Sequence, residues 1–391
     1  MRQGVLEIEK RGLKRMYRIG IVGGGQLGKM MILDAKRLDT YFVILDPTPK
    51  CPADSIADEH IVAEFDDVHA FHELAEKVDV VTYEFEHINA EALKELEAEG
   101  HKVYPSSETL LHIQNKYHQK EWLKQHGLPV PDFKKVETPE DIREAGKVFG
   151  YPMMLKTCTG GYDGKGNAPV ETEADVESAF EGLGAGKLPL MVEAFCPFEK
   201  EVSVLVCRSV NGDVKVFPVA ENVHKDSILD ETTVPANISD ECTKKAMDIA
   251  REAVHVFDAC GMLCIELFVT GDGQVLVNEL APRPHNSGHY TIEGCVTSQY
   301  ENHIRGILGL PLGSTELLRP TVMKNIIGQY PVDRAEVKGL DEAYAIGEVK
   351  VHIYGKEKVS KGRKMGHITV TAPTVAEALE KARLAHSKIS F

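Results

Sequence analysis

Acidic, amide, basic and imidazole side chains are concentrated in one short segment of this chain, residues 278–289. The segment reads Asn-Glu-Leu-Ala-Pro-Arg-Pro-His-Asn-Ser-Gly-His, and a further acidic residue, Glu266, lies upstream. A structural role alone seldom requires so many ionisable groups side by side. Carboxylates can bind a hard cation, and a guanidinium matches planar oxyanions. The segment is therefore the first candidate for a catalytic or binding site.

A predicted β-hairpin brings two of these acids together. Two apolar, β-branched runs flank a Gly-Asp-Gly triplet at residues 271–273. With a two-residue turn, Gly271 faces Gln274, and counting outward places Glu266 directly opposite Glu279 on the same face. Facing carboxylates repel, which predicts a cation between them. Magnesium typically shares such carboxylates with substrate phosphates.

The alternative is that both glutamates are solvated side chains on an exposed sheet face, as most strand glutamates are. The flanking residues are nearly all apolar, and the arginine-histidine loop follows at once, which favours a site. A register slip of one residue would put Glu266 and Glu279 on opposite faces.

The composition is that of a globular protein with two or three domains. The chain has 391 residues, 43% hydrophobic and 27% charged, and a formal net charge of −15, which argues against a nucleic-acid-binding protein. We find no apolar run long enough to span a membrane and no signal-peptide core. The eight cysteines show no CxxC pairs, which is typical of reduced thiols in the cytoplasm.

Three domains of α/β and α+β class must position these residues. Strands alternate with helices in the first domain and predict a parallel, Rossmann-like sheet. A helix over residues 112–126 leads to a small domain with a glycine-rich flap, and a larger domain with a mixed sheet and a strand over residues 214–220 follows. We expect residues 1–15 to be a poorly ordered extension, with Met16 a candidate start. The expected domain boundaries are 16–110, 111–195 and 196–391.

Two glycine-rich segments could approach phosphates. Gly23-x-Gly25-x-x-Gly28 follows a strand, and Asp46 ends the next one, as in a dinucleotide fingerprint. This favours an NAD-dependent oxidoreductase, another phosphorylated ligand, or only a tight turn. The second segment, residues 159–166, reads TGGYDGKG between two strands and predicts a flap over phosphates or an ordinary mobile hairpin.

Several other residues are candidates for binding the same ligand. Lys156 ends the strand before the flap and favours phosphate binding there. Glu193 and Glu201 flank a linker that could present backbone groups to an adenine, although alone each is more typical of a solvated surface. A basic cluster near the end of the chain could bind a phosphate or could be a solvated hairpin tip; it comprises Lys356, Lys358, Lys361, Arg363 and Lys364.

Taken in order, these motifs resemble the ATP-grasp superfamily. The segments GGYDGKG and NELAPRPHNSGH are similar to those of one family within it, the 5-(carboxyamino)imidazole ribonucleotide synthases of purine biosynthesis. The resemblance runs from about Tyr17 to the end of the chain. It departs from the family at His112, where many relatives carry an arginine.

The resemblance implies a role for each matching residue. Those implied to bind the nucleotide are His112, Lys116, Lys156, Gly161, Tyr162, Asp163, Gly164, Lys165, Gly166, Asn167, Glu193, Ala194, Phe195, Cys196, Glu201, His224, Asn278 and Glu279. Glu266 and Glu279 would hold magnesium or manganese. The implied catalytic residues are Asp163, Lys165, Arg283 and His285. Those implied to bind the ribonucleotide or bicarbonate are Gly25, Gln26, Leu27, Glu84, Tyr162, Asn286, Ser287, Lys356 and Arg363.

The implied reaction uses ATP and bicarbonate to carboxylate the exocyclic amine of 5-aminoimidazole ribonucleotide through carboxyphosphate. The resemblance also implies a cytoplasmic homodimer that is functionally coupled to the mutase that moves the new carboxylate. Two alternatives stay open. One is another ATP-grasp ligase, such as a formate-dependent glycinamide ribonucleotide transformylase or a biotin carboxylase. The other is the NAD-dependent oxidoreductase.

Overall fold

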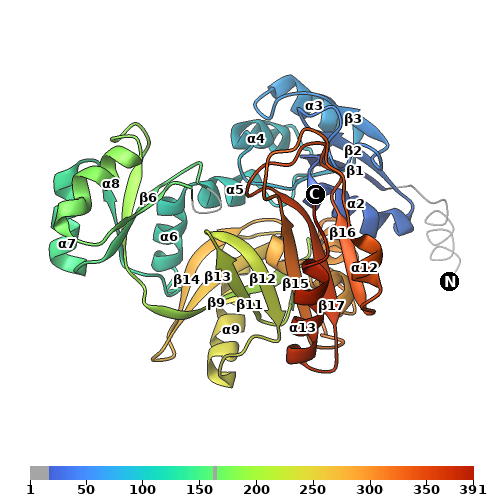
Figure 1. Cartoon of the computed structure of the whole chain (residues 1–391). Coiled ribbons are helices and arrows are strands. Elements are labelled where there is room, and N and C mark those ends of the chain that lie inside the picture. Colours follow the sequence, from blue (N-terminus) through green and yellow to red (C-terminus); the bar gives the residue numbers. More distant parts are fainter. Residues whose placement is uncertain (1–16, 162–164) are drawn as a thin grey trace, which may run out of the picture.

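Three β-sheets organise the chain in the computed structural model, which describes residues 17–161 and 165–391 (Figure 1). The expected extension, residues 1–15, lies outside the described residues. One four-stranded sheet is N-terminal, a second forms a small domain, and the third has nine strands. In Figure 1 the small domain projects to the left of the body that the other two sheets form.

The N-terminal sheet is parallel, in the order β3-β2-β1-β4. Its strands are β1 (Tyr17–Val22), β2 (Thr40–Leu45), β3 (Glu59–Ile61) and β4 (Val80–Tyr83). The helices that connect them or follow are α2 (Gln26–Ala35), a 3-10 turn (Lys36–Leu38), α3 (Val68–Lys77) and α4 (Ala90–Ala98). Helices cover both faces, so strand residues such as Ile19 and Phe42 are fully buried. The predicted alternation of strands and helices is confirmed.

The predicted single helix over residues 112–126 is wrong. Two helices occupy this region, α5 (Ser107–Gln114) and α6 (Lys116–Gln125). Asn115 is extended between them, and its side chain accepts the backbone N–H groups of Tyr117 and His118. Asparagine is a favoured N-cap, and this cap starts a new helix at Lys116. The backbone N–H of Lys116 donates to Cys158 O at 2.7 Å, which ties α6 to the start of the glycine loop.

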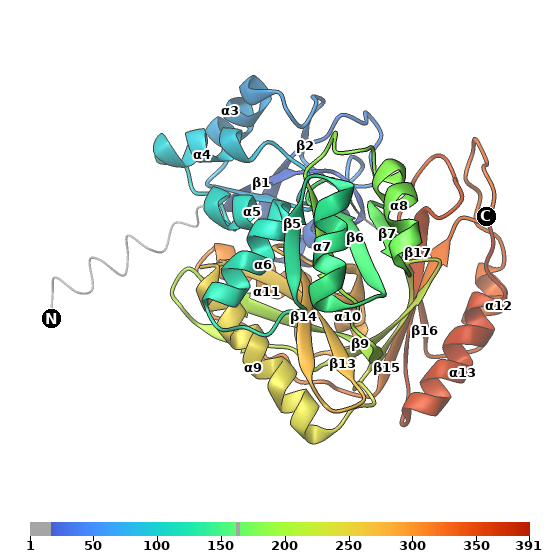
Figure 2. The same cartoon turned by 90° about the vertical axis from the view of Figure 1, so that its left-hand side faces the viewer.

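The small domain is an antiparallel sheet in the order β5-β8-β6-β7, packed against two helices (Figure 2). Its elements are β5 (Phe133–Val136), α7 (Pro139–Phe149), β6 (Met153–Thr157), β7 (Asn167–Val170), a 3-10 turn (Glu173–Asp175), α8 (Val176–Gly182) and β8 (Leu190–Ala194). The glycine loop joins β6 to β7. Thr157 N–H donates to Gly166 O at 2.8 Å at the base of this loop. Gly166 has φ +84°, and a Cβ there would collide with Thr157, so the stem requires glycine.

The large sheet runs β14-β13-β9-β11-β12-β15-β17-β16, with β10 paired to β9. Its strands are β9 (Phe198–Arg208), β10 (Val214–Val216), β11 (Ala220–Lys225), β12 (Ile228–Val234), β13 (Gly261–Thr270), β14 (Val275–Ala281), β15 (Thr321–Ile327), β16 (Val349–Ile353) and β17 (Lys364–Thr371). Its helices are α9 (Asp240–Val256), a 3-10 turn (Asn286–Gly288), α10 (Thr291–Gly294), α11 (Gln299–Ile307), α12 (Leu340–Tyr344) and α13 (Val375–His386).

Two expectations for this domain need correction. The sheet was expected to be mixed, but every strand pair in it is antiparallel. The predicted strand over residues 214–220 is two strands, β10 and β11, which both pair with β9. Pro218 lies between them and cannot donate to a strand ladder, which accounts for the break.

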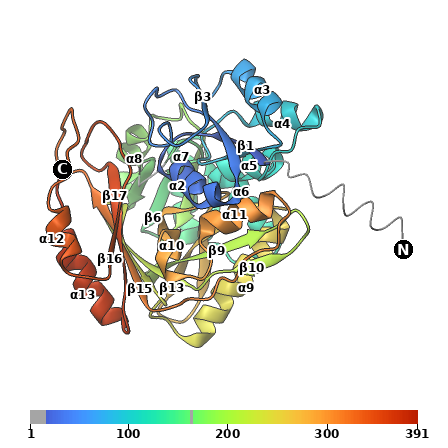
Figure 3. The same ribbon diagram turned by 90° about the vertical axis from the view of Figure 1, so that its right-hand side faces the viewer.

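The N-terminal and large sheets form one body because α2 packs against α11, as Figure 3 shows. Buried polar contacts join the same two parts. His303 Nε2 lies 2.8 Å from Thr82 Oγ1 of β4, and its Nδ1 accepts Met262 N–H of β13 at 3.0 Å. Within the described ranges, no helix is both long and apolar enough to cross a membrane.

Candidate active site

A cavity of about 1160 Å³ lies where the three domains meet. Most of the residues to which the resemblance assigns a role line it. They are Gln26, Leu27, Glu84, Lys116, Lys156, Gly161, Lys165, Asn167, Glu193, Ala194, Phe195, Cys196, Glu201, His224, Glu266, Asn278, Glu279, Arg283, His285 and Asn286. Those that do not line it are Gly25, His112, Gly166, Ser287, Lys356 and Arg363. Tyr162, Asp163 and Gly164 lie outside the described residues.

Glu266 on β13 lies directly opposite Glu279 on β14, as predicted. The predicted turn, however, is wrong. The strands close through a three-residue loop, with Val269 opposite Val275 and Thr270 N–H donating to Gln274 O at 3.1 Å. That register alone would put Glu266 opposite Asn278.

A β-bulge restores the facing pair. Leu267 is opposite Val277, but Glu266 is opposite Glu279, so Asn278 is an extra residue in β14. Val277 and Leu280, on either side of the bulge, both pack into the apolar cluster beneath α9. The bulge therefore lets Asn278 and Glu279, although consecutive, both line the cavity beside Glu266.

The acidic pair is electrostatically uneven. Burial, and then the negative charge of Glu279, raise the pKa of Glu266. Burial would also raise the pKa of Glu279, but Lys116 forms a close ion pair with it and lowers that pKa below its ordinary value. Among the described residues no group of three or more His, Cys, Asp or Glu forms a ready cluster for a metal. Two carboxylates and the Asn278 amide nevertheless supply oxygen donors of the kind that magnesium takes.

A second charged group is fully buried nearby. Glu193, at the end of β8, lies between Lys156 Nζ at 2.8 Å and Lys120 Nζ at 3.3 Å. Lys156 Nζ also lies 3.5 Å from Asn278 Oδ1. Burial lowers the pKa of Lys120 to about 8, although Glu193 acts in the opposite direction. Lys120 was not predicted, and its position on α6, one turn after Lys116, is the signal that could have revealed it.

Aromatic side chains contribute to the lining of the cavity. Phe198 and Phe268 stack with ring centroids 4.5 Å apart and an interplanar angle of 6°, and Phe195 is also among the lining residues. Beside them Glu201 Oε2 lies 2.5 Å from His224 Nδ1. Burial lowers the pKa of His224, but the bond to Glu201 outweighs burial and raises it. An apolar stack beside a hydrogen-bonding acid can accommodate a base and its sugar.

Arg283 lines the cavity and is paired with a carboxylate. Its Nε and Nη2 donate to the two oxygens of Glu86 at 2.6 and 3.0 Å. Burial would raise the pKa of Glu86, but the charge of Arg283 outweighs it and lowers the pKa to about 2. Glu86 lines the cavity and is absent from the predicted site. This bidentate pair holds the guanidinium plane in one orientation.

His285 and Asn286 follow Arg283 on the same loop. Burial lowers the pKa of His285 to about 3, so its ring is neutral. His285 Nε2 lies 3.7 Å from Glu266 Oε1. Asn286 and Asn325 exchange two amide hydrogen bonds of 3.0 and 2.7 Å, which fixes the loop to β15. The resemblance implied that Ser287 contacts the substrate, but its hydroxyl is buried and bonded to His285 instead.

The glycine-rich turn after β1 is already filled by acidic side chains. Gly28 N–H donates to Glu84 Oε2 at 2.7 Å, and Gly25 N–H donates to the other oxygen of the same carboxylate. Gly24 N–H donates to Asp46 Oδ2 at 2.8 Å. In a dinucleotide fold these N–H groups would bind a pyrophosphate. A Cβ on Gly25 would collide with Glu84, so the glycine accommodates this carboxylate.

The basic cluster near the end of the chain is only partly at the cavity. Lys364 lines it, although the resemblance implied Lys356 and Arg363. Lys356 Nζ donates to Lys364 O at 2.8 Å, and Arg363 is exposed and donates to Lys358 O at 2.8 Å. Their placement therefore favours Lys364 over Arg363 as a cavity cation.

The nucleotide contact implied for His112 is not supported by its position. Its ring stacks on Trp122 with centroids 4.4 Å apart and meets Phe257 edge-on. The helix break at Asn115 separates His112 from Lys116, so the two side chains are not on one continuous helical face. His112 belongs to the packing between α5, α6 and α9.

Three family models match the chain. They are a ribonucleotide synthetase preATP-grasp domain over residues 16–114, an ATP-grasp domain over residues 121–300, and a phosphoribosylaminoimidazole carboxylase C-terminal domain over residues 321–381. The chain is 44% identical over 353 residues to the N5-carboxyaminoimidazole ribonucleotide synthase of Bacillus subtilis, covering 90% of each chain. It is 41% identical to the phosphoribosylaminoimidazole carboxylase of Candida albicans, covering 92% of this chain and 65% of the fungal one.

Solved structures are similar over nearly the whole chain. The N5-carboxyaminoimidazole ribonucleotide synthetase of Thermotoga maritima has a TM-score of 0.87 and 45% identity, covering 96% of this chain and 99% of that one. The Aspergillus clavatus synthase, in complex with ADP and 5-aminoimidazole ribonucleotide, has a TM-score of 0.88 and 38% identity, covering 95% and 98%.

Proposed function

The chain belongs to the N5-carboxyaminoimidazole ribonucleotide synthase family, and on this premise we propose how its cavity carries out that reaction. The enzyme is an ATP-dependent carbon–nitrogen ligase of purine biosynthesis. It uses ATP and bicarbonate to carboxylate the exocyclic amine of 5-aminoimidazole ribonucleotide. The observation that carries this assignment to named residues is the bulge at Asn278, which sets two carboxylates beside Lys116 and Lys156 in one cavity.

The nucleotide would lie between the small domain and the large sheet. Lys116 and Lys156 supply positive charge for its phosphates, and each is paired with a carboxylate until the nucleotide arrives. The glycine loop between β6 and β7 would cover the phosphates. The Phe198–Phe268 stack would hold the adenine, with Glu201 on the ribose.

Glu266 and Glu279 would hold magnesium, with Asn278 beside them. The fit rests on the donor set, because two partly buried carboxylates face each other and Lys116 pairs with one of them. When bound, magnesium would offset negative charge on the phosphates.

Carboxylation proceeds in two bond exchanges. A bicarbonate oxygen attacks the γ-phosphorus of ATP, the bond to the β-phosphate oxygen breaks, and carboxyphosphate and ADP form. The ribonucleotide amine then attacks the carboxyl carbon of carboxyphosphate, or of carbon dioxide released from it. In both cases the carbon–oxygen bond to phosphate breaks, and the released phosphate can take the proton that the amine loses. Arg283, oriented by Glu86, would bind the carboxyl unit.

The ribonucleotide would enter from the side of the N-terminal domain. Glu84 and Gln26 line the cavity there, and Lys364 at the start of β17 lines the same cavity. We propose Lys364, with Lys356, as the cations nearest the ribonucleotide phosphate. Gly25 and Leu27 would contribute through the backbone shape of the turn that Glu84 fills.

The direct test measures ADP release with purified protein, ATP, magnesium, bicarbonate and 5-aminoimidazole ribonucleotide. ADP release should depend on the ribonucleotide and on bicarbonate. If ADP forms at the same rate without the ribonucleotide, the substrate assignment fails. Formate with glycinamide ribonucleotide, and biotin, test the other ATP-grasp ligases in the same assay.

The oxidoreductase alternative loses its structural basis. Its pyrophosphate would need N–H groups that already donate to Glu84 and Asp46. A fluorescence titration with NADH should show no saturable binding.

We also propose a cytoplasmic homodimer that passes its product to the mutase acting next. The support is the family resemblance. Sedimentation velocity of the full chain tests the dimer, because a single species of monomer mass would contradict it.

A further inference from the structure

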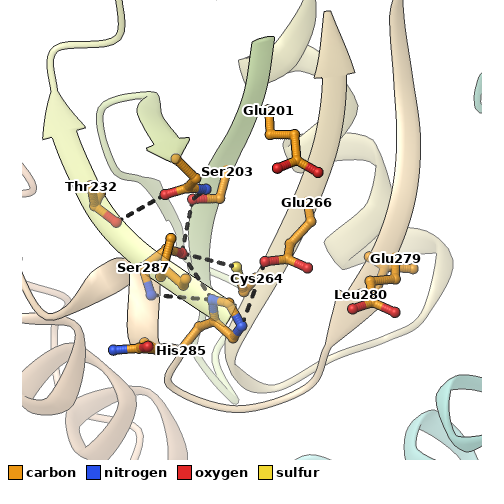
Figure 4. A network of polar contacts seen from close by, with 12 residues as sticks. Glu201, Ser203, Thr232, Cys264, Glu266, Glu279, Leu280, His285 and Ser287 are labelled. Atoms are coloured by element: carbon orange, nitrogen blue, oxygen red, sulfur yellow. Dashed lines mark hydrogen bonds and ion pairs between the residues drawn. The ribbon is translucent and has the colours of Figure 1, made fainter. Parts of the chain in front are cut away.

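A chain of hydrogen bonds runs from the large sheet to the ring of His285 (Figure 4). Thr232 Oγ1 donates to Asn222 Oδ1 at 2.9 Å, and Asn222 Nδ2 donates to Ser203 Oγ at 2.9 Å. Ser203 Oγ donates to Ser287 Oγ at 2.8 Å, and Ser287 Oγ lies 2.8 Å from His285 Nδ1. Thr232, Asn222, Ser203 and Ser287 are all buried.

This series of hydrogen bonds runs in one direction. Each hydroxyl carries a single hydrogen. The hydroxyl of Ser203 receives from Asn222 and gives its hydrogen to Ser287, so the hydrogen of Ser287 is left for His285 Nδ1. Nδ1 is therefore an acceptor.

A second contact gives the same answer independently. The backbone N–H of Ser287 also donates to His285 Nδ1, at 3.3 Å. A backbone N–H can only donate, so Nδ1 carries no hydrogen. The backbone of His285 is held as well, because Gln299 accepts its N–H at 2.9 Å and donates to its carbonyl at 2.8 Å.

A neutral imidazole has one N–H, which must then be on Nε2. Nε2 lies 3.7 Å from Glu266 Oε1, and His285 lines the cavity beside Arg283. The ring therefore presents a donor to the site and has no lone pair there with which to accept a proton.

We propose that Ser287, Ser203 and Asn222 are positioning residues that hold His285 as its Nε2–H tautomer, a hydrogen-bond donor to the carboxyl group being transferred. The inference rests on the proposed function, in which bicarbonate supplies that group. It gives Ser287 a role through His285 in place of direct substrate contact. It also makes His285 a donor that stabilises negative charge on oxygen and not a general base.

The tautomer can be measured without any turnover. In protein labelled with 15N-histidine, long-range proton–nitrogen correlations distinguish pyridine-like from pyrrole-like ring nitrogens, and a His285→Gln spectrum assigns the signals. The wild-type spectrum should show a pyridine-like Nδ1 and a pyrrole-like Nε2. A hydrogen on Nδ1 overturns the proposal. Because the spectrum needs no substrate, it decides the tautomer even if the substrate assignment fails.

The isosteric substitution Asn222→Asp should reverse the direction of these hydrogen bonds. The Asn222→Asp carboxylate can only accept, so the hydrogen of Ser203 turns toward it and Ser287 turns toward Ser203. We expect the Nε2–H signal of His285 to weaken without vanishing, because the Ser287 backbone N–H still donates to Nδ1 in this variant. An unchanged His285 spectrum would show that Asn222 does not set the direction. If Asn222→Asp does not fold, the wild-type spectrum and the kinetics of the Ser287 variants still decide the proposal.

Kinetics separate positioning from packing. Ser287→Ala should lower kcat about 10- to 100-fold, the usual effect of removing a group that orients a site residue. The KM for ATP should stay within about threefold of wild type, and Ser287→Thr, which keeps the hydroxyl, should recover most of the loss.

The matched control is Cys264→Ala. Cys264 Sγ lies 3.8 Å from Ser287 Oγ in the same buried cluster but is not a link in the chain. Cys264→Ala should leave kcat near the wild-type value. An equal loss in Cys264→Ala and Ser287→Ala would show that packing alone is responsible and would overturn the proposal.

Discussion

Glu266 and Glu279 face each other across β13 and β14 because Asn278 is an extra residue in β14. The hairpin loop has three residues rather than two, which shifts the register by one. The bulge shifts it back before the two glutamates are reached. A regular ladder from the observed loop would have placed Asn278 opposite Glu266 and pointed Glu279 toward the apolar cluster under α9.

The facing pair predicts a specific dependence on magnesium. Glu279→Gln removes the negative charge of one proposed magnesium ligand. It also leaves Lys116 without its carboxylate partner. We expect kcat to fall about 100-fold or more, as when charge stabilisation at a reacting phosphate is lost, and the magnesium concentration for half-maximal rate to rise. Magnesium titrations of ADP release measure both.

Glu199→Gln is the control for this prediction, because Glu199 is an exposed residue at the same cavity. It should change neither quantity appreciably. If Glu279→Gln keeps the magnesium dependence of wild type, the pair is not the metal site.

The Glu86–Arg283 pair predicts a pH dependence of stability. The pKa of Glu86 falls from the ordinary 4.5 to about 2 in the fold. A lowered acid pKa stabilises the protein above the ordinary value, and this stabilisation is lost as pH falls through about 2. At neutral pH Glu86→Gln leaves Arg283 buried without its partner, which should cost about 3–5 kcal/mol of unfolding free energy.

Urea unfolding at a series of pH values tests this directly. The difference between wild type and Glu86→Gln should be constant at neutral pH and narrow below about pH 4.5. A difference that stays the same throughout the acid range would mean that the ionised pair is not its source.

Glu84 should be required for folding stability as well as for binding. Its carboxylate accepts N–H groups from both Gly25 and Gly28. Glu84→Gln replaces one acceptor oxygen with a donor, so one buried N–H loses its partner, which costs about 1–3 kcal/mol.

Chemical denaturation measures the change, and Glu76→Gln, an exposed site on α3, should stay within about 0.5 kcal/mol of wild type. Equal stability of Glu84→Gln and wild type would argue that the turn is held by its glycines alone.

Lys120 should affect the KM for ATP, because it competes with Lys156 for Glu193. Both lysines share Glu193. Without Lys120, Lys156 is the only cationic partner of Glu193 at these distances among the described residues, and Glu193 should hold it more tightly. Lys120→Met is therefore expected to raise the KM for ATP about tenfold while kcat stays within about threefold.

Lys124→Met is the control that tests whether losing any lysine of α6 raises the KM for ATP. Lys124 is exposed and pairs with Asp132 at 3.6 Å. It should behave as wild type. A KM for ATP that is unchanged in Lys120→Met would remove Lys120 from the site.

Much of the fold follows from local patterns. Alternation of buried strands with amphipathic helices predicts the parallel N-terminal sheet, and four glycines between two strands predict the flap. Two of the predictions that failed depend on single residues. Asn115 starts a second helix by capping it, and Pro218 divides a strand, while the rest of each segment fits the longer element.

The site was harder to complete from sequence than to locate. Glu86 is separated from Arg283 by 197 positions, and no pattern along the chain relates them. In the sequence Phe268 is an ordinary strand residue, and only the pairing of β13 with β9 places Phe198 against it.

The sequence by itself determined where the chemically reactive residue types are concentrated, because side-chain type and strand period are local properties. It also determined that Glu266 and Glu279 share a face, although through a turn that the protein does not use. Only the tertiary structure decided what each group is bonded to. Glu84 fills a turn that looks like a dinucleotide site, and Ser203 and Asn222 set the hydrogen on His285. These bonds join residues from different strands and domains, so they arise only when packing brings the elements together.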